Sequence, residues 1–366
     1  MVKLLLNSIR FDPLIQYAAH YNFTVYPGNT YDYSPLNASD EARMYEAMYG
    51  KGNCYDQTLD CYHTGRSDIC PYAEAFCTDE VEAVLDNIAH RDGYDIRRSS
   101  DDPFPETFYV DYLNTPKVQA AIGAYTNFSR SSSTIGAAFT RTGDGDHVGG
   151  GIIEHMRSLI NDNITIVMYA GDADYYCNWL GVEAVAGKIN PPGFRYAGYT
   201  DMNTSDGIVH GQVKQAGAFT FARIFESGHA VPYYQPLVSL EMFKRVLAGK
   251  DIATGEISVK GGSDYKTIGS KQSWWREGNS AIQPGKVSQD ATYNTTTNMP
   301  NSVNQTAGAT AKWSVGLKKA DMRRVMRSPN GWTDEFWDNL CRMPAVTRFG
   351  YVCPTKVRRA ATLHAN

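Results

Sequence analysis

The chain has 366 residues, of which 42% are hydrophobic and 12% aromatic, so it is long enough for one large packed domain or two ordinary ones. It contains no apolar run of about 18 residues, the length typical of a membrane-spanning helix. The net charge is −4, and the charges are distributed unevenly along the chain. Residues 312–366 hold 11 basic and 4 acidic side chains, and residues 1–311 hold 24 basic and 35 acidic ones. An acidic body does not indicate nucleic-acid binding.

Strands and helices are predicted to alternate along residues 1–255. The apolar runs at 2–6 and 164–169 are typical of buried strands, and 205–226 suits a hairpin followed by a strand. Helices are expected where apolar residues recur at helical spacing or where a proline can open a helix, near 13–21, 42–49, 116–124, 149–161, 179–187 and 236–249. In the last of these, Leu240, Phe243 and Leu247 share one face.

Four cysteines with symmetric spacing stand in a segment, residues 50–110, that is rich in Cys, Asp and Tyr. Cys54, Cys61, Cys70 and Cys77 are 7, 9 and 7 residues apart, which suits two nested disulfides. Four cysteines allow three pairings, and the sequence does not choose among them. A zinc site is the alternative, but the Cys-x₂-Cys pair common in such sites is absent.

Disulfides would place the chain in an oxidising compartment, and a second feature agrees with that. Seven Asn-x-Ser/Thr sequons occur, which are potential N-glycosylation sites, at Asn22, Asn37, Asn127, Asn163, Asn203, Asn294 and Asn304. The first eight residues do not form a signal peptide, because their apolar stretch is short and no small-residue cleavage site follows. Secretory features without this signal lead us to expect a truncated sequence.

Two segments carry chemistry. The strand predicted at 164–169 is followed by GDADYYCNW (residues 171–179), and an apolar run at 220–225 is followed by GHAVP (228–232). A carboxylate after one strand and a histidine after a later one form the second half of a Ser…Asp…His triad in α/β-hydrolase order. The serine should stand upstream in a Gly-x-Ser-x-Gly turn, and the sequence contains no such pentapeptide.

These segments resemble the serine carboxypeptidases. The family pattern around the acid is similar to residues 169–181, and the pattern around the base is similar to 228–236. A third segment, YLNTPKVQ at 112–119, is similar to the entry into the second half of that fold, and DIATG at 251–255 looks like the fungal secreted branch. The resemblance covers roughly residues 3–255. It departs at Ala230, where family members often have a larger residue.

The resemblance implies an α/β-hydrolase fold that is incomplete because its N-terminal strands are missing. It implies a lid insertion at about 40–110, closed by the nested disulfides Cys54–Cys77 and Cys61–Cys70. The implied activity is release of C-terminal residues from peptides through an acyl-enzyme, with no cofactor and no metal. Peptides would be the partners, the full-length protein would be secreted or vacuolar, and no oligomeric state is indicated.

The resemblance also assigns roles within the two motifs. Asp174, the second aspartate of its motif, would be the acid and His229 the base. The alternative is that both aspartates only cap the following helix, and we expect this role for Asp172 from its sequence position. Cys177 would line the same site as an unpaired thiol near the substrate pocket, although a small buried core residue is an equal alternative. Ala230 would border the pocket.

The composition changes after residue 255. Residues 256–310 are dominated by Ser, Thr, Asn, Gln, Gly and Lys, which predicts a disordered linker, and 311–366 form a basic tail of unknown structure that contains Cys341 and Cys353. Because the nucleophile is absent, we expect the chain as given to be inactive. The alternative function is a non-catalytic secreted glycoprotein or binding module derived from a carboxypeptidase.

Overall fold

The computed structural model describes residues 3–7, 12–25, 28–31, 33–100, 108–142, 151–259, 263–273, 293–294 and 299–300. The chain divides into two compact units, Met1–Val287 and Ser288–Asn366. In the second unit the described residues are two short antiparallel strands, β8 (Tyr293–Asn294) and β9 (Met299–Pro300). The predicted basic tail at 311–366 lies outside the described residues.

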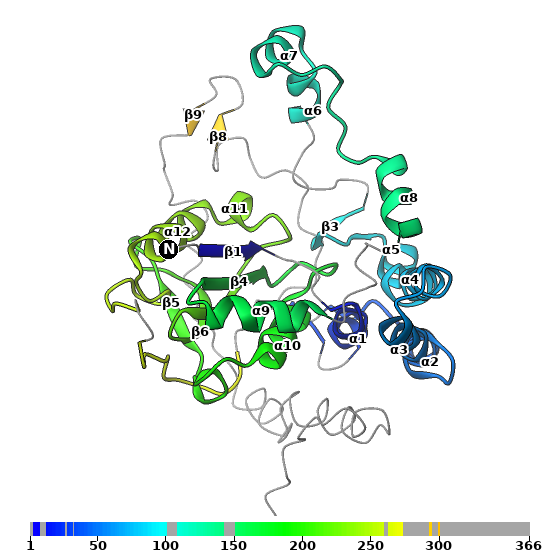
Figure 1. Cartoon of the computed structure of the whole chain (residues 1–366), viewed down its shortest axis with the longest axis horizontal. Coiled ribbons are helices and arrows are strands. Elements are labelled where there is room, and N and C mark those ends of the chain that lie inside the picture. Colours follow the sequence, from blue (N-terminus) through cyan, green and yellow to red (C-terminus); the bar gives the residue numbers. More distant parts are fainter. Residues whose placement is uncertain are drawn as a thin grey trace, which may run out of the picture. The chain divides into compact units, whose positions relative to one another are not determined.

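A five-stranded mixed sheet organises the first unit (Figure 1). Its order is β1 (Lys3–Asn7), β4 (Thr165–Gly171), β7 (Phe219–Ile224), β6 (Val209–Ala216) and β5 (Thr200–Asn203). The first three strands are parallel, and β6 and β5 continue the sheet as antiparallel strands. The carboxyl ends of β1, β4 and β7 therefore share one edge of the sheet.

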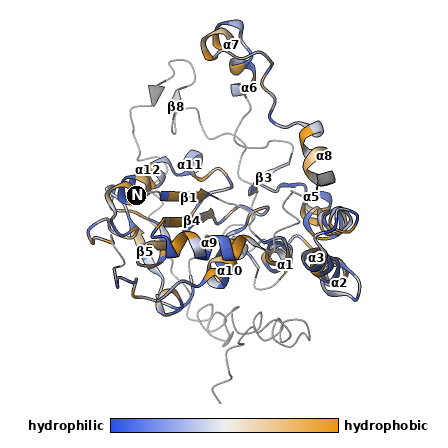
Figure 2. Cartoon of the chain, in the orientation of Figure 1, coloured by the Kyte–Doolittle hydropathy of each residue, from blue (hydrophilic) through white to orange (hydrophobic). Residues whose placement is uncertain are grey.

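Helices cover both faces of this sheet, and the strand sequences explain why. Neighbouring side chains of a strand point to opposite faces, so a strand buried on both faces is largely apolar, as Figure 2 shows for β4, which is buried from Ile166 to Gly171. Val167 and Ala222 pack in a core cluster with Met242 of α12 (Pro236–Ala248). The opposite face carries α10 (Trp179–Ile189), which packs on β4, on α9 (Ile152–Asn161) and on α1 (Pro13–Thr24).

The helix α12 buries a different face from the one noted in its sequence. Val238, Met242 and Val246 are buried in the core cluster. The side chains of Leu240, Phe243 and Leu247 are instead 49%, 47% and 57% exposed. The helix therefore carries two apolar faces at helical spacing, and the sheet covers one of them.

The segment between β1 and β4 contains a helical insertion held by two disulfides. Bonds join Cys54 to Cys77 and Cys61 to Cys70, which is the nested arrangement. The elements of this insertion are α2 (Ala38–Tyr49), α3 (Cys54–Thr64), α4 (Cys70–Cys77), the π-helical turn η1 (Thr78–Glu82), α5 (Val84–Ala89) and the hairpin of β2 (Arg91–Asp92) and β3 (Asp95–Ser99).

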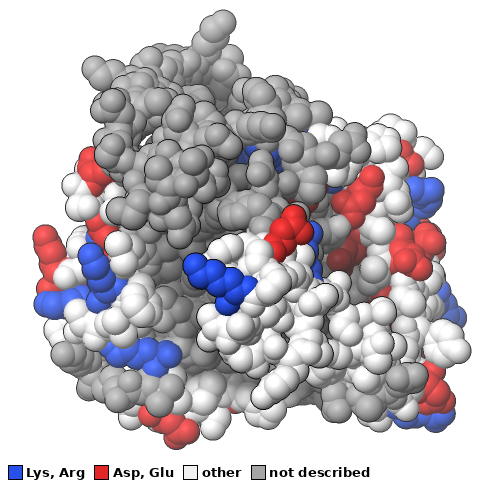
Figure 3. Space-filling model, turned by 90° about the horizontal axis from the view of Figure 1, so that it is seen from above, with Lys and Arg blue, Asp and Glu red and all other residues white. Residues whose placement is uncertain are grey.

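Three further helices precede α9: α6 (Phe108–Leu113), α7 (Pro116–Ile122) and α8 (Ser133–Thr142). Ile122 at the end of α7, Ile135 in α8 and Tyr125 in the connection between these two helices are exposed apolar side chains. On the face drawn in Figure 3, acidic and basic side chains are interspersed. Within the described ranges, no helix combines the length and the apolar character that crossing a membrane requires.

Part of the predicted polar linker packs against the sheet. Thr267 is buried, and its hydroxyl donates to the carbonyl of Gly198 at 2.6 Å. Single β-bridges pair Ser270 with Tyr199 and Lys266 with Ala216. These polar residues pack here because main-chain groups of Tyr199, before β5, and of Gln215 and Gly217, at the end of β6, hydrogen-bond to their main chain. Of the segment that was expected to be disordered, the described residues 256–259 and 263–273 are thus attached to the body.

The core assignment predicts unequal costs for two phenylalanine truncations. Phe221→Ala empties a fully buried position in β7 and should lower the free energy of unfolding by about 3–5 kcal/mol. Phe243→Ala, on the exposed face of α12, should change it by less than about 1 kcal/mol. Urea denaturation of both variants measures the two values, and equal losses would contradict the packing described here.

Candidate active site

The sheet edge shared by β4 and β7 holds two loops. The acid loop, residues 172–178, follows β4, and the base loop, residues 225–230, follows β7. Main-chain bonds join the loops directly, because Asp172 N donates to Ile224 O at 3.0 Å and Ala173 N donates to Ser227 O at 2.9 Å. A Cβ atom at Gly171 would lie 2.2 Å from Ser227 O, so this approach requires glycine.

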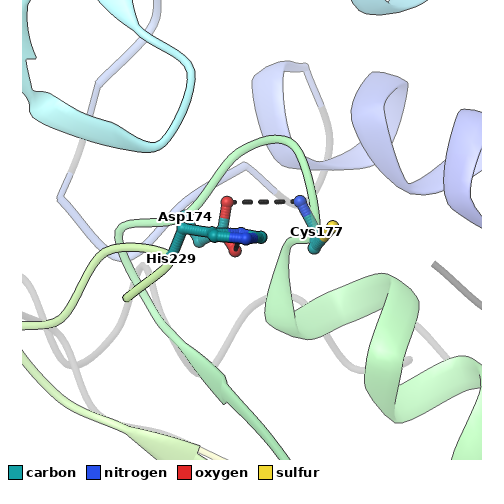
Figure 4. Close-up of side chains that lie close together, drawn as sticks. All are labelled: Asp174, Cys177 and His229. Atoms are coloured by element: carbon teal, nitrogen blue, oxygen red, sulfur yellow. Dashed lines mark hydrogen bonds and ion pairs between the residues drawn. The ribbon is translucent and has the colours of Figure 1, made fainter. Parts of the chain in front are cut away.

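Asp174 and His229 meet between these loops. The imidazole Nδ1 of His229 lies 3.0 Å from Oδ2 of Asp174, and the other carboxylate oxygen accepts the main-chain N–H of Cys177 at 3.2 Å (Figure 4). An ionised carboxylate only accepts, so Nδ1 carries the proton and Nε2 presents its lone pair. Asp174 is fully buried, whereas 35% of the His229 side chain is exposed. The arrangement can thus take up a proton on Nε2 and stabilise the resulting imidazolium.

The electrostatics of His229 follow from this geometry. Burial lowers the pKa of the imidazole, but the hydrogen bond and the negative charge of Asp174 raise it, with a further contribution from Asp92. The net result is a pKa above the usual histidine value. The charged partner therefore outweighs desolvation at this half-buried position.

Comparison with known proteins identifies the family. The model of the serine carboxypeptidase family matches residues 10–249. The chain belongs to the serine carboxypeptidase family.

Fungal carboxypeptidases are among the relatives of this chain. Carboxypeptidase S1 homolog A of Arthroderma otae is 38% identical over 273 residues, covering 70% of this chain and 42% of the relative. Carboxypeptidase S1 of Penicillium janthinellum is 31% identical over 256 residues, covering 69% and 59%. The vacuolar serine-type carboxypeptidase ATG42 of Saccharomyces cerevisiae is 32% identical, covering 65% and 47%. The chain spans less than two thirds of the length of each.

A solved structure shows the fold. The crystal structure of Kex1(delta)p, a prohormone-processing carboxypeptidase from Saccharomyces cerevisiae, superimposes with a TM-score of 0.51 at 16% identity, covering 68% of this chain and 54% of that one. Together with the mixed sheet, this likeness establishes the α/β-hydrolase fold.

Asp172 does not have the helix-capping role that its sequence position predicted. The cap of α10 is Asn178, whose Oδ1 accepts the N–H of Gly181 at 3.0 Å, because a cap must stand directly before the helix. Asp172 is instead fully buried beside the guanidinium of Arg223 and accepts the hydroxyl of Tyr31 at 2.9 Å. Burial raises its pKa, while these partners and Arg97 oppose the rise.

The other predicted site residues lie next to the pair. Cys177 is buried and forms no disulfide with the other described cysteines. One ligand atom each from Asp174, Cys177 and His229 lies within 4.8 Å of the others, so these three side chains could hold a metal ion. Ala230 follows His229 directly and precedes α11 (Val231–Tyr234). Trp179 is buried against the guanidinium of Arg223, 4.4 Å from the ring centroid.

Two groups that the sequence did not indicate contact His229. The side-chain amide of Asn7, at the end of β1, donates to the carbonyl of His229 at 2.8 Å. The ring of Tyr94, in the turn of the insertion hairpin, packs edge-on against the imidazole with centroids 5.1 Å apart. Neither residue stands in a motif, so only the three-dimensional fold brings them here.

The sequons differ in exposure, and this yields a prediction. The asparagines at 37, 127, 163 and 203 are exposed, whereas Asn22 is buried inside α1 together with Thr24, and the side chains of Asn294 and Asn304 lie outside the described part. A glycan at Asn22 would disrupt the packing of α1. Secretion from a eukaryotic host followed by glycosidase treatment in ¹⁸O-water should label the exposed sites and leave Asn22 unlabelled; a labelled Asn22 would contradict this burial.

The pKa of His229 gives a second prediction. Asp174→Asn removes the charge that raises this pKa, so burial should dominate and bring it below the ordinary histidine value. Histidine-labelled NMR titrations of both proteins measure the change. His155→Ala, an exposed change on α9, is the control and should leave the titration of His229 as it is. An unchanged pKa in Asp174→Asn would show that the carboxylate does not act on this imidazole.

Proposed function

We propose that this chain supplies the acid and the base of a serine carboxypeptidase, with Asp174 as the acid and His229 as the base. The observation that supports this most is the 3.0 Å contact between Nδ1 and the buried carboxylate, at the shared carboxyl edge of two parallel strands. α/β-Hydrolases position their triads at such strand ends.

In the proposed reaction, a serine hydroxyl attacks the carbonyl carbon of the last peptide bond of a substrate. His229 accepts the hydroxyl proton at Nε2 and then donates it to the leaving amino group, while Asp174 holds the tautomer and stabilises the cation. Water then cleaves the acyl-enzyme with His229 again as base. Cys177 and Ala230 are proposed to border the pocket of the substrate, a peptide with a free C-terminus.

We further propose that the nucleophile is not among these 366 residues, which contain no Gly-x-Ser-x-Gly turn. Ser227 is the nearest serine in sequence to the base, but it is fully buried and its hydroxyl donates to the carbonyl of Gly228 at 3.0 Å. A nucleophile also needs two preorganised oxyanion donors beside it. The chain would therefore be inactive alone, and its disulfides suit a secreted or vacuolar carboxypeptidase.

Activity measurements test this proposal. The purified chain should show no turnover of blocked dipeptides above background and should not be labelled by a serine-directed phosphonylating reagent, because His229 can activate only a hydroxyl held against it. Turnover and serine labelling by the chain itself would overturn the proposal of a missing nucleophile.

A longer protein that contains the serine provides the positive control for these activity measurements. Fusion of the upstream segment of a relative, with its Gly-x-Ser-x-Gly turn, should give turnover, and His229→Ala in that protein should lower kcat by about 10⁶-fold. The matched control His155→Ala should retain activity, since that side chain is exposed on α9. If His229→Ala keeps its activity, His229 is not the base and a non-catalytic binding role is favoured.

A further inference from the structure

The hairpin of the insertion, residues Arg91–Ser99, crosses the acid loop. The carbonyl of Gly93 accepts the main-chain N–H groups of both Tyr175 and Tyr176 at 3.0 Å. On the next strand, Ile96 N donates to Ala173 O at 2.9 Å. A Cβ atom at Gly93 would lie 2.4 Å from the ring of Tyr176, so this ring packs directly against the backbone of the glycine. The hairpin thus brackets Asp174 on both sides.

The same hairpin also holds the base loop. The main-chain N–H of His229 donates to the carbonyl of Tyr94 at 2.9 Å. A Cβ atom at Gly228 would lie 2.4 Å from that carbonyl and 2.9 Å from the Cβ of Asp95, so this close approach of the hairpin requires glycine. One turn of the insertion therefore bonds to the residue that carries the base and to the residues that flank the acid.

A buried ion pair fixes the shape of this turn. Asp95 and Arg97 are both buried, and the guanidinium forms a two-pronged contact with the carboxylate, with Nε and an Nη each 2.8 Å from an oxygen. The main-chain N–H of Arg97 donates to the same carboxylate at 3.0 Å. Two-pronged contacts of this kind fix orientation as well as distance.

The ion pair is itself held from several elements. The guanidinium of Arg97 lies 5.7 Å from the ring centroid of Tyr31 and 5.5 Å from that of Tyr234, whose hydroxyl is hydrogen-bonded to Asp95. Arg97 also interacts electrostatically with Asp172, the first aspartate of the acid loop. The ion pair therefore interacts with Tyr31 after α1, with Asp172 in the acid loop and with Tyr234 in α11.

We propose that Asp95 and Arg97 are positioning residues for the base, acting through the carbonyl of Tyr94 on the backbone of His229. This inference rests on the proposed role of His229 in catalysis. It means that the insertion, and not the sheet alone, sets the geometry between base and acid. Displacement of the hairpin would release His229 while the strands remain folded.

Hydrogen exchange and NMR of the full chain test this. Asp95→Asn keeps the size of the side chain but removes its charge, which should loosen the turn and accelerate amide exchange at His229 by at least about tenfold relative to the sheet. The low-field proton resonance of His229 Nδ1–H, assigned by its loss in His229→Gln, should broaden because its bond to Asp174 is no longer held.

Asp12→Asn is the matched control. Asp12 is equally buried and accepts from Lys188, from the hydroxyl of Tyr62 and from the N–H of Ile15, none of which belongs to the two loops. Asp12→Asn should lower the free energy of unfolding. It should not change amide hydrogen exchange at His229 relative to the sheet, or the Nδ1–H resonance. Equal effects of Asp95→Asn and Asp12→Asn, or no effect of Asp95→Asn, would overturn the positioning role.

If Asp95→Asn does not fold, the double variant Asp95→Asn/Arg97→Gln avoids leaving a buried charge unpaired. It should fold and still show faster exchange at His229, and normal protection there would overturn the proposal. Amide exchange and the Nδ1–H resonance can be measured without turnover, so they test the positioning role separately. The proposed activity is tested by His229→Ala in the longer protein.

Discussion

Parallel pairing between β4 and β7 is the constraint on which the site depends. The register places Gly171 opposite Ile224, so the chain leaves both strands at the same height. Two main-chain bonds then continue the ladder beyond the strands, and these keep the acid and base loops in contact. Residues 55 positions apart in the sequence can therefore meet at 3.0 Å. A one-residue shift in this register would turn every strand side chain to the opposite face and separate the loops.

The second constraint is charge buried behind the site. Asp172 and Arg223 are fully buried, and Asp95 and Arg97 are nearly so, which gives two charges of each sign. Such pairs do not by themselves imply high stability, because removing both charges from water costs about as much as their attraction returns. Their geometry is demanding, however, and loss of one partner leaves the other unpaired. We therefore interpret these two buried ion pairs as contacts that fix the positions of the loops.

The sequence predicted the elements whose signals are local. Apolar runs gave β1 and β4, and the prolines at 116 and 236 marked the starts of α7 and α12. On α12, however, two apolar faces have the same spacing, so periodicity could not show that Met242 is buried and Phe243 exposed. Neither the short edge strand β5 nor the charged hairpin at 91–99 was predicted, because polar residues indicate solvent unless their partners are known.

The same reasoning applies to the site. The motif around Asp174 and His229 is local to two strand ends, so the sequence could name both residues. The role of Asp172 depends on Tyr31 and Arg223, which are 141 and 51 residues away, and no spacing rule connects them. Long-range polar contacts of this type emerge only from the packed fold.

Three separate parts of the fold fix the position of His229. The acid loop holds its imidazole, the insertion hairpin accepts its main-chain N–H, and Asn7 at the end of β1 donates to its carbonyl. A side chain held at the ring and on both sides of its peptide backbone has little freedom to reorient. None of these bonds involves a serine hydroxyl, so the contact between His229 and Asp174 is held by the two loops, the hairpin and β1 alone.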